Sequence, residues 1–330
     1  MAGAGQFAAA MRFSRPPFYR SPMMTLTRGL ARFAHFVAIS ALPLPLLAQT
    51  SDTAARRDKP CASCAEWNAP QRPFRLYGNT FFVGTHGLSA ILIASRDGHV
   101  LIDGGLPESA PSIIANVRAL GFRIEDVKLI LNSHAHFDHA GGIAELQRAS
   151  GATVAASQWS ARVLNSGTTG RGDPQYGIVS SFPPAHDTEV IADGDTLRVG
   201  TIAMTAHFTP GHTPGGTSWS WRSCDGKRCL DFVYADSQTP VSADGFYFTR
   251  STTYPSAIAD FERGFATLDR LRCDVLVTPH PGASSLWERV AARDSGRSEP
   301  ALEDPAACKR YVANAREQLA RRIAKETGKQ

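Results

Sequence analysis

The chain has 330 residues, of which 43% are hydrophobic and 20% are charged. This composition is typical of a globular protein with a substantial core, and the length allows one large domain or two ordinary ones. The formal net charge is +5, but no stripe of lysine and arginine with interleaved aromatic residues accompanies it. We therefore expect no binding of nucleic acid.

Residues 1–48 have the pattern of an N-terminal extension with a secretory signal peptide. Five arginines precede residue 33 without any acidic residue, an apolar stretch follows from Phe33 to Leu47, and Ala48 is a small residue suited to cleavage. The apolar stretch is short and contains a histidine and two prolines, so it predicts neither a spanning helix nor a stable membrane anchor. We expect export to the periplasm.

Residues 49–73 are polar and contain prolines, so we expect an extended N-terminal arm, followed by a single domain over 74–330. The start of that domain alternates apolar strands with turns and amphipathic helices. Gly121 and Gly151 suit the ends of two helices, and an Asp-Gly pair suits a hairpin turn. The predicted strands are 74–77, 80–83, 89–94, 100–102, 127–132 and 153–156, and the predicted helices are 109–120 and 143–150.

The second half repeats this order of several strands and then a helix. Residues 165–174 are rich in turn-forming residues and predict a mobile surface loop that closes over a substrate. Two groups of strands with helices between them predict an α/β (α+β) fold, in which two mixed sheets pack face to face with helices outside. The predicted strands are 188–191, 196–199, 202–208, 217–221, 230–234 and 275–277, and the predicted helices are 257–271 and 305–325.

The six cysteines fall into three groups, Cys61 with Cys64, Cys224 with Cys229, and Cys273 with Cys308. Disulfides are the default in an exported protein. The second group flanks a turn-like stretch between two strands, which suits a bridge across a hairpin. The third would pin the helical tail to a buried strand. The first group has the spacing of a redox motif but stands in a proline-rich leader, so we prefer a disulfide there to a redox or zinc-binding role.

One loop concentrates metal-binding side chains. It follows the apolar strand 127–132 and contains His134, His136, Asp138 and His139, a density of imidazoles that packing does not require. Two more histidines, at 212 and 280, also follow apolar strands and precede turns. Six ligands suffice for two zinc ions with three protein ligands each, which leaves each ion an open position for water. The other histidines of the domain are expected in solvated turns (His86 and His99) or at structural positions (His186 and His207).

The pattern His-x-His-x-Asp-His resembles the signature of the metallo-β-lactamase superfamily. Within this superfamily the chain resembles class B β-lactamases of the third subclass. Three features support this resemblance: the secretion signal, the stretch 84–90 and the sequence Tyr-Ala-Asp-Ser at 234–237. This resemblance implies an αββα sandwich with the metals in a shallow groove at one edge. It assigns His134, His136 and His212 to the first zinc, and Asp138, His139 and His280 to the second.

Ser237 separates this chain from other branches of the superfamily. Other β-lactamase subclasses carry a cysteine ligand at that place, and thioesterase or lactonase relatives carry a bridging aspartate. We place Asp236 outside the ligand set, but a bridging Asp236 would favour a lactonase-like enzyme. By the same resemblance, Ser237 and Thr239 bind the substrate carboxylate, and Asp138 also orients the nucleophile.

The resemblance implies zinc-dependent hydrolysis of the β-lactam amide bond in penicillins, cephalosporins and carbapenems, by a hydroxide held between two zinc ions. Such an activity gives antibiotic resistance. We expect a small-molecule substrate and a monomeric protein. One alternative is an exported dizinc lactonase or thioesterase of the same superfamily. A second is a zinc-binding protein without catalytic activity.

Overall fold

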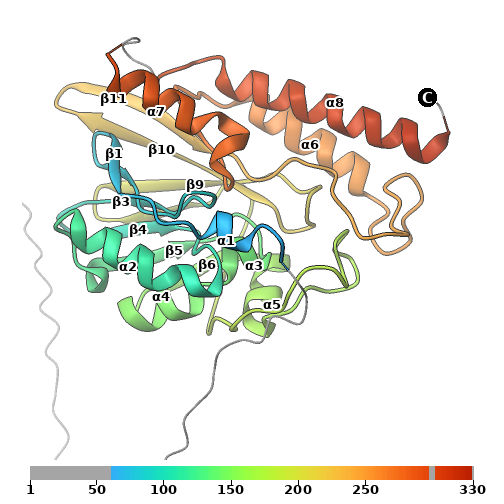
Figure 1. Ribbon diagram of the computed structural model, residues 1–330, viewed down its shortest axis with the longest axis horizontal. Helices are drawn as coiled ribbons and strands as arrows, with labels where there is room; N and C mark the ends of the chain where they lie inside the picture. The colour runs from blue at the N-terminus through green and yellow to red at the C-terminus, as the bar shows by residue number, and fades with distance from the viewer. Residues whose placement is uncertain (1–60, 297–301, 329–330) are drawn as a thin grey trace, which may run out of the picture. The chain divides into compact units, whose positions relative to one another are not determined.

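The computed structural model describes residues 61–296 and 302–328. The predicted signal peptide and the start of the expected arm lie outside the described residues. Two β-sheets pack face to face, and helices cover the outer side of each (Figure 1). The predicted αββα sandwich of two mixed sheets flanked by helices is confirmed.

The first sheet has seven strands, which lie in chain order. Its first three pairings are antiparallel, and the pairings from the fourth strand onward are parallel. The fifth strand is apolar on both faces, because Leu129 and Leu131 face the second sheet while Val127 and Ile130 face the helices. The strands are β1 (Phe74–Tyr77), β2 (Thr80–Phe82), β3 (Ile91–Ile93), β4 (His99–Ile102), β5 (Val127–Leu131), β6 (Thr153–Ser157) and β7 (Glu189–Ile191).

The second sheet has five strands in the order β12-β11-β10-β9-β8. All pairings are antiparallel except that of β11 with β12. The hairpin of β10 and β11 is longer than the sequence predicted and places Cys224 opposite Cys229, where the two form a disulfide. The strands are β8 (Thr196–Val199), β9 (Ile202–Phe208), β10 (Thr217–Asp225), β11 (Arg228–Tyr234) and β12 (Val275–Val277).

Helices α2, α4 and α5 pack on the first sheet, and α6 and α8 pack on the second (Figure 1). The sequence predicted α2, α4, α6 and α8 but not the others. No helix within the described ranges is long and apolar enough to cross a membrane. The helices are α1 (Cys64–Trp67), α2 (Ala110–Ala119), α3 (Phe137–Ala140), α4 (Ile143–Ser150), α5 (Gln158–Ser166), α6 (Ala257–Arg270), α7 (Leu286–Asp294) and α8 (Ala307–Thr327), with 3-10 turns at Pro107–Ser109, Ile124–Asp126 and Pro281–Ser284.

The main core lies between the two sheets, where large side chains such as Phe82, Trp219 and Phe232 are completely buried. Trp219 also donates from Nε1 to the backbone oxygen of Asn132 at 3.1 Å, a bond between the second sheet and the end of β5. The packing of the two sheets therefore fixes the position at which the loop after β5 begins.

Two expectations about local structure were wrong. Residues 61–73 are not extended throughout, because they contain α1 and the Cys61–Cys64 disulfide, and Ala69 accepts a backbone hydrogen bond from the amide of His86. His99 is buried rather than solvated, since it begins the central strand β4. The third disulfide, Cys273–Cys308, joins the entry of β12 to the first turn of α8.

Candidate metal centre

Three loops at one edge of the sandwich bring six side chains together. They follow β5, β9 and β12, and each contributes at least one histidine. The ring centroids of His134 and His139, one from each group of three, lie 4.5 Å apart, so the two groups adjoin. In each group the potential ligand atoms lie within 4.8 Å of one another: His134, His136 and His212 form one, and Asp138, His139 and His280 the other.

Asp103, at the end of β4, holds the loop that follows β5. Its carboxylate is fully buried and accepts hydrogen bonds from the amide of Ser133 at 2.8 Å, the Ser133 hydroxyl at 2.6 Å, Asn132 Nδ2 at 3.1 Å and the Tyr234 hydroxyl at 2.8 Å. Burial raises the pKa of Asp103 to about 6, although the charge of His139 and these hydrogen bonds act to lower it. The loop therefore leaves the sheet in one fixed direction, into the metal centre.

The loop after β9 needs glycine at two positions to bring His212 close. Gly211 has φ +139°, and a Cβ there would lie 2.5 Å from the ring of Phe261. A Cβ on Gly216 would lie 2.5 Å from Asp236 Oδ2. The backbone can approach both neighbours because neither residue has a side chain.

Each histidine of the first group has one ring nitrogen held by an oxygen acceptor. Such a partner fixes that nitrogen as the N–H, so the lone pair of the other nitrogen can bind a metal ion. At His212 that other nitrogen, Nε2, lies 3.3 Å from Gln175 Nε2. All three acceptors come from loops outside the His-x-His motif. The pairs are His134 Nδ1 with Asp236 Oδ1 at 2.7 Å, His136 Nε2 with Asp173 Oδ2 at 2.9 Å, and His212 Nδ1 with the backbone oxygen of Thr239 at 2.8 Å.

The first group fits a zinc ion. His134 Nε2 is buried and has no hydrogen-bond partner among the described residues, which is costly for a polar atom unless a metal ion satisfies it. Burial lowers the pKa of His212 to about 3 and that of His134 well below its usual range. Both imidazoles are therefore neutral, which is the form that binds a metal ion.

The second group fits a zinc ion as well. Asp138 Oδ2 lies 3.3 Å from His139 Nε2 and 3.3 Å from His280 Nε2, and ligand atoms of a tetrahedral zinc lie about 3.4 Å apart. Burial acts to raise the pKa of Asp138, but the two histidines hold it well below its usual range. The group therefore offers one carboxylate and two imidazoles, a donor set typical of zinc.

The residues expected beside the metals lie close by. Asp236 contacts His134 at Nδ1 and belongs to neither group of candidate ligands. Ser237 is 8% exposed and follows it directly. Thr239 contacts His212 through its backbone oxygen and through its hydroxyl, whose oxygen is 3.2 Å from Nδ1. The observed contact of Thr239 is therefore with a candidate ligand, and substrate binding by Ser237 and Thr239 stays a prediction.

Two residues of the site were not predicted from the sequence. Asp173 was placed in a mobile surface loop, but it is 2% exposed, because it accepts hydrogen bonds from His136 and from the amide of Gln175 at 2.8 Å. The ring centroid of Trp67, in the expected arm, lies 5.1 Å from that of His280. Neither residue stands in a local pattern that indicates a site, since both contacts are made across the fold.

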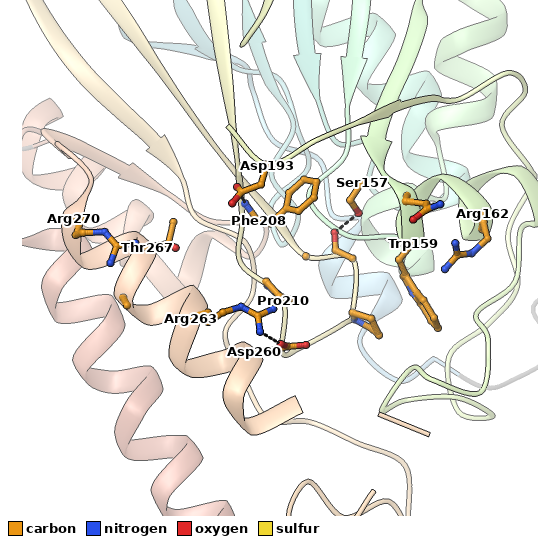
Figure 2. A pocket seen from close by; sticks show the side chains of 15 residues that line it. Ser157, Trp159, Arg162, Asp193, Phe208, Pro210, Asp260, Arg263, Thr267 and Arg270 are labelled. Carbon is orange, nitrogen blue, oxygen red and sulfur yellow. Dashed lines mark hydrogen bonds and ion pairs between the residues drawn. The ribbon is translucent and has the colours of Figure 1, made fainter. Parts of the chain in front are cut away.

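A groove of about 600 Å³ lies beside the loop that carries His212 but is not part of the metal centre. Figure 2 shows Trp159 and Arg162 of α5 on one side and Arg263 of α6 on the other, with Arg263 paired to Asp260. The described residues that line it include Pro210 but none of the six candidate ligands. One side of the His212 loop thus faces this groove.

Comparison with known proteins agrees with this geometry. A model of the metallo-beta-lactamase superfamily matches residues 83–284. The chain is similar to the solved structure of the Rm3 metallo-beta-lactamase, with 58% identity, a TM-score of 0.79 and coverage of 81% of this chain and 99% of that one. It is also similar to MEM-A1, a subclass B3 metallo-beta-lactamase from a soil metagenome library, with 49% identity, a TM-score of 0.78 and coverage of 80% and 100%.

Curated relatives match over shorter regions. A hydroxyacylglutathione hydrolase of Anaeromyxobacter dehalogenans is 32% identical over 130 residues, which are 39% of this chain and 40% of that protein. The chain spans about half of the length of the curated relatives it matches, between 40% and 59% for three of them. The superfamily model, however, covers more than half of this chain. The protein is a hydrolase that belongs to the metallo-beta-lactamase superfamily and resembles its subclass B3 members.

Proposed function

We propose that this protein hydrolyses the amide bond of β-lactams, including penicillins, cephalosporins and carbapenems, with two zinc ions as cofactors. The observation that carries the proposal is the position of Asp236, which holds His134 from behind at 2.7 Å instead of standing between the two ligand groups. Similarity to the Rm3 and MEM-A1 metallo-beta-lactamases over about four fifths of the chain supports the same substrate class.

The proposed ligands are His134, His136 and His212 for one ion, and Asp138, His139 and His280 for the other. Bound zinc would supply Lewis acidity, which polarises a carbonyl group and lowers the pKa of water.

The chain's own residues would orient the reactants. Asp138 is ionised at neutral pH, because the neighbouring histidines lower its pKa, so its carboxylate can accept a hydrogen bond from the attacking water. The water oxygen forms a bond to the lactam carbonyl carbon, the carbon–nitrogen bond breaks, and the ring nitrogen takes up the proton. Ser237 and Thr239 would bind the substrate carboxylate beside the two ligand groups.

Export to the periplasm is proposed on two grounds. The first is the signal-like sequence of residues 1–48. The second is that all six cysteines are paired in three disulfides, which form and persist in oxidising compartments. In that compartment the activity would protect the cell wall and so give antibiotic resistance. We propose a monomer, with residues 74–330 as one catalytic domain.

The alternative is an exported dizinc lactonase or thioesterase. It is favoured by the buried Oδ2 of Asp236, which has no hydrogen-bond partner among the described residues, and by similarity to a hydroxyacylglutathione hydrolase. A zinc-binding protein without turnover is the second alternative.

Purified protein separates the three functions. We expect opening of the β-lactam ring of a chromogenic cephalosporin and of a carbapenem, loss of activity with a chelator, and recovery with zinc. Hydrolysis of an acyl homoserine lactone or a glutathione thioester without any ring opening would replace the proposal by the alternative. Stable binding of zinc without turnover of any of these substrates would support a non-catalytic protein.

A further inference from the structure

The long segment between β11 and α6 carries the residues that hold two candidate ligands. Residues 235–256 contain neither helix nor strand. Asp236 holds His134, and Thr239 holds His212. Irregular segments of this length inside a domain are uncommon and are either functional or linker-like. This one needs external support if its first residues are to position two imidazoles.

Helix α8 supplies that support at two places. Near its start, the Tyr311 hydroxyl donates to the backbone oxygen of Asp236 at 2.9 Å and accepts from the amide of Gln238 at 3.2 Å. The Cys273–Cys308 disulfide lies less than one turn away from Tyr311 and fixes this end of the helix to β12. Tyr311 therefore fixes the backbone on both sides of Ser237.

The second place is a partly buried ion pair in the last turns of α8, in which the Arg322 side chain is 25% exposed. Glu326 is paired with Arg322 at 2.6 Å, and its side chain is only 3% exposed. Its carboxylate accepts hydrogen bonds from the amide of Phe248 at 3.1 Å, from the amide of Thr249 at 2.9 Å and from the Thr249 hydroxyl at 2.9 Å. One side chain thus satisfies two backbone donors of a segment that has no strand partner.

Arg322 completes this contact from the other side. Its Nη2 donates to the Ser242 hydroxyl at 2.7 Å and to the backbone oxygen of Phe246 at 2.9 Å, and its guanidinium lies 5.2 Å from the ring of Phe248. Phe248 itself is buried in the cluster between α6 and α8. The pair Arg322–Glu326 therefore binds residues 242–249 through backbone, hydroxyl and ring together.

We propose that α8, which lies outside the residues that match the superfamily model, is a clamp that positions residues 236–249 for the reaction. Tyr311, Arg322 and Glu326 are its positioning residues. Tyr311 acts on the metal side, because it fixes the backbone of Asp236. Arg322 and Glu326 act on the substrate side, because they fix the part of the segment that follows Thr239. The proposal rests on the proposed function only for its kinetic consequence.

The same helix offers a matched control. Arg321 pairs with Glu317, again four residues apart, but both side chains are more than 60% exposed. Among the described residues, no hydrogen bond or ion pair joins either of them to the segment. The variants Arg322→Ala and Arg321→Ala remove the same kind of residue from neighbouring positions. Glu326→Gln keeps the shape of the clamp and removes its charge, so it replaces Arg322→Ala if that variant does not fold.

Hydrogen–deuterium exchange of the purified protein tests the clamp without reference to activity. Loss of a hydrogen bond to a charged group corresponds to an increase of about 10- to 100-fold in local opening. We expect the amides of 246–249 to exchange faster by that factor in Arg322→Ala and Glu326→Gln, and to be unchanged in Arg321→Ala. Exchange equal to that of the wild-type protein in both clamp variants would overturn the proposal.

Kinetics and zinc affinity then distinguish the role of Tyr311 on the metal side from that of Arg322 on the substrate side. In Arg322→Ala we expect KM for a cephalosporin to rise about tenfold while kcat changes less than about threefold. In Tyr311→Phe we expect a loss of about fivefold in zinc affinity, the effect of one neutral hydrogen bond. Equal KM in Arg322→Ala and Arg321→Ala, with an active wild-type protein, would refute the substrate-side role. If the wild-type protein opens no β-lactam, the proposed function fails, and the exchange result alone decides the clamp.

Discussion

Replacing Asp173 with alanine should weaken zinc binding at the first ligand group and leave the second group nearly unchanged. Its carboxylate accepts two hydrogen bonds, from His136 Nε2 at 2.9 Å and from the amide of Gln175 at 2.8 Å. Without it, the N–H of His136 is buried without an acceptor, and the ring can exchange tautomers. The second group shares no hydrogen-bond partner with Asp173 among the described residues.

The size of the effect follows from these contacts. Removing the carboxylate partner of a metal-ligating histidine costs about 10- to 100-fold in affinity, or about 1.4–2.7 kcal/mol. The free energy of unfolding of the metal-free protein should fall as well, by about 3 kcal/mol, because two hydrogen bonds to a buried carboxylate are lost. Asp173→Asn should lie between the two proteins, since its oxygen can still accept from His136.

The assay is a titration of metal-free protein with zinc in competition with a chromophoric chelator. Two binding steps are expected, of which Asp173→Ala shifts one. Asp244→Ala is the control, because Asp244 is exposed and lies in the neighbouring segment. Superimposable curves for the wild-type protein and Asp173→Ala would refute the reasoning, and so would equal losses at both steps.

Three other variants test separate parts of the structure. His139→Ala should lower zinc content from two ions to one by elemental analysis; two ions bound with unchanged affinity would show that the ligand division is wrong. Replacing Cys273 and Cys308 by serine opens a bridge across 35 residues and should lower the free energy of unfolding by about 4 kcal/mol, measured with urea; a loss below about 1 kcal/mol contradicts this. Burial acts to raise the pKa of Glu326, but its hydrogen bonds lower it below 4.5. The ionised carboxylate therefore stabilises the fold above pH 4.5, and its stability advantage over Glu326→Gln should vanish as pH falls through the lowered pKa; an advantage independent of pH contradicts this.

The fold could be predicted because its strands are apolar over short, clearly bounded runs. A histidine-bearing turn follows each of β5 and β12, and this order already placed the histidines of both turns at strand ends. Helix α5 was not predicted, although Ser157 caps its start and Gly167 ends it in the left-handed conformation. From the sequence, no element was predicted for residues 158–164, and residues 165–174 were predicted to form a loop because turn-forming residues predominate there.

The candidate ligands could be predicted because four of them lie within six residues, but the residue that holds each histidine could not. Asp236 is 102 residues from His134, and Asp173 is 37 residues from His136. Asp173 is an isolated aspartate in a turn-rich stretch, and Asp236 follows a strand; neither position shows which histidine the side chain will contact. Such pairs are created by the packing of the two sheets, and a single sequence has no local pattern that records them.

The difference between the ligands and the residues that hold them bears on how the site gains a particular activity. The His-x-His-x-Asp-His motif belongs to a superfamily that includes enzymes with several substrates, and the ligands alone therefore do not select one. The orientation of each imidazole in the first group depends on Asp173, Asp236 or Thr239, and two of these stand in the segment that α8 contacts. A change in α8 can therefore alter metal geometry and substrate binding without altering any ligand. Specificity in this protein should thus respond to substitutions in α8 as well as to substitutions in the metal-binding loops.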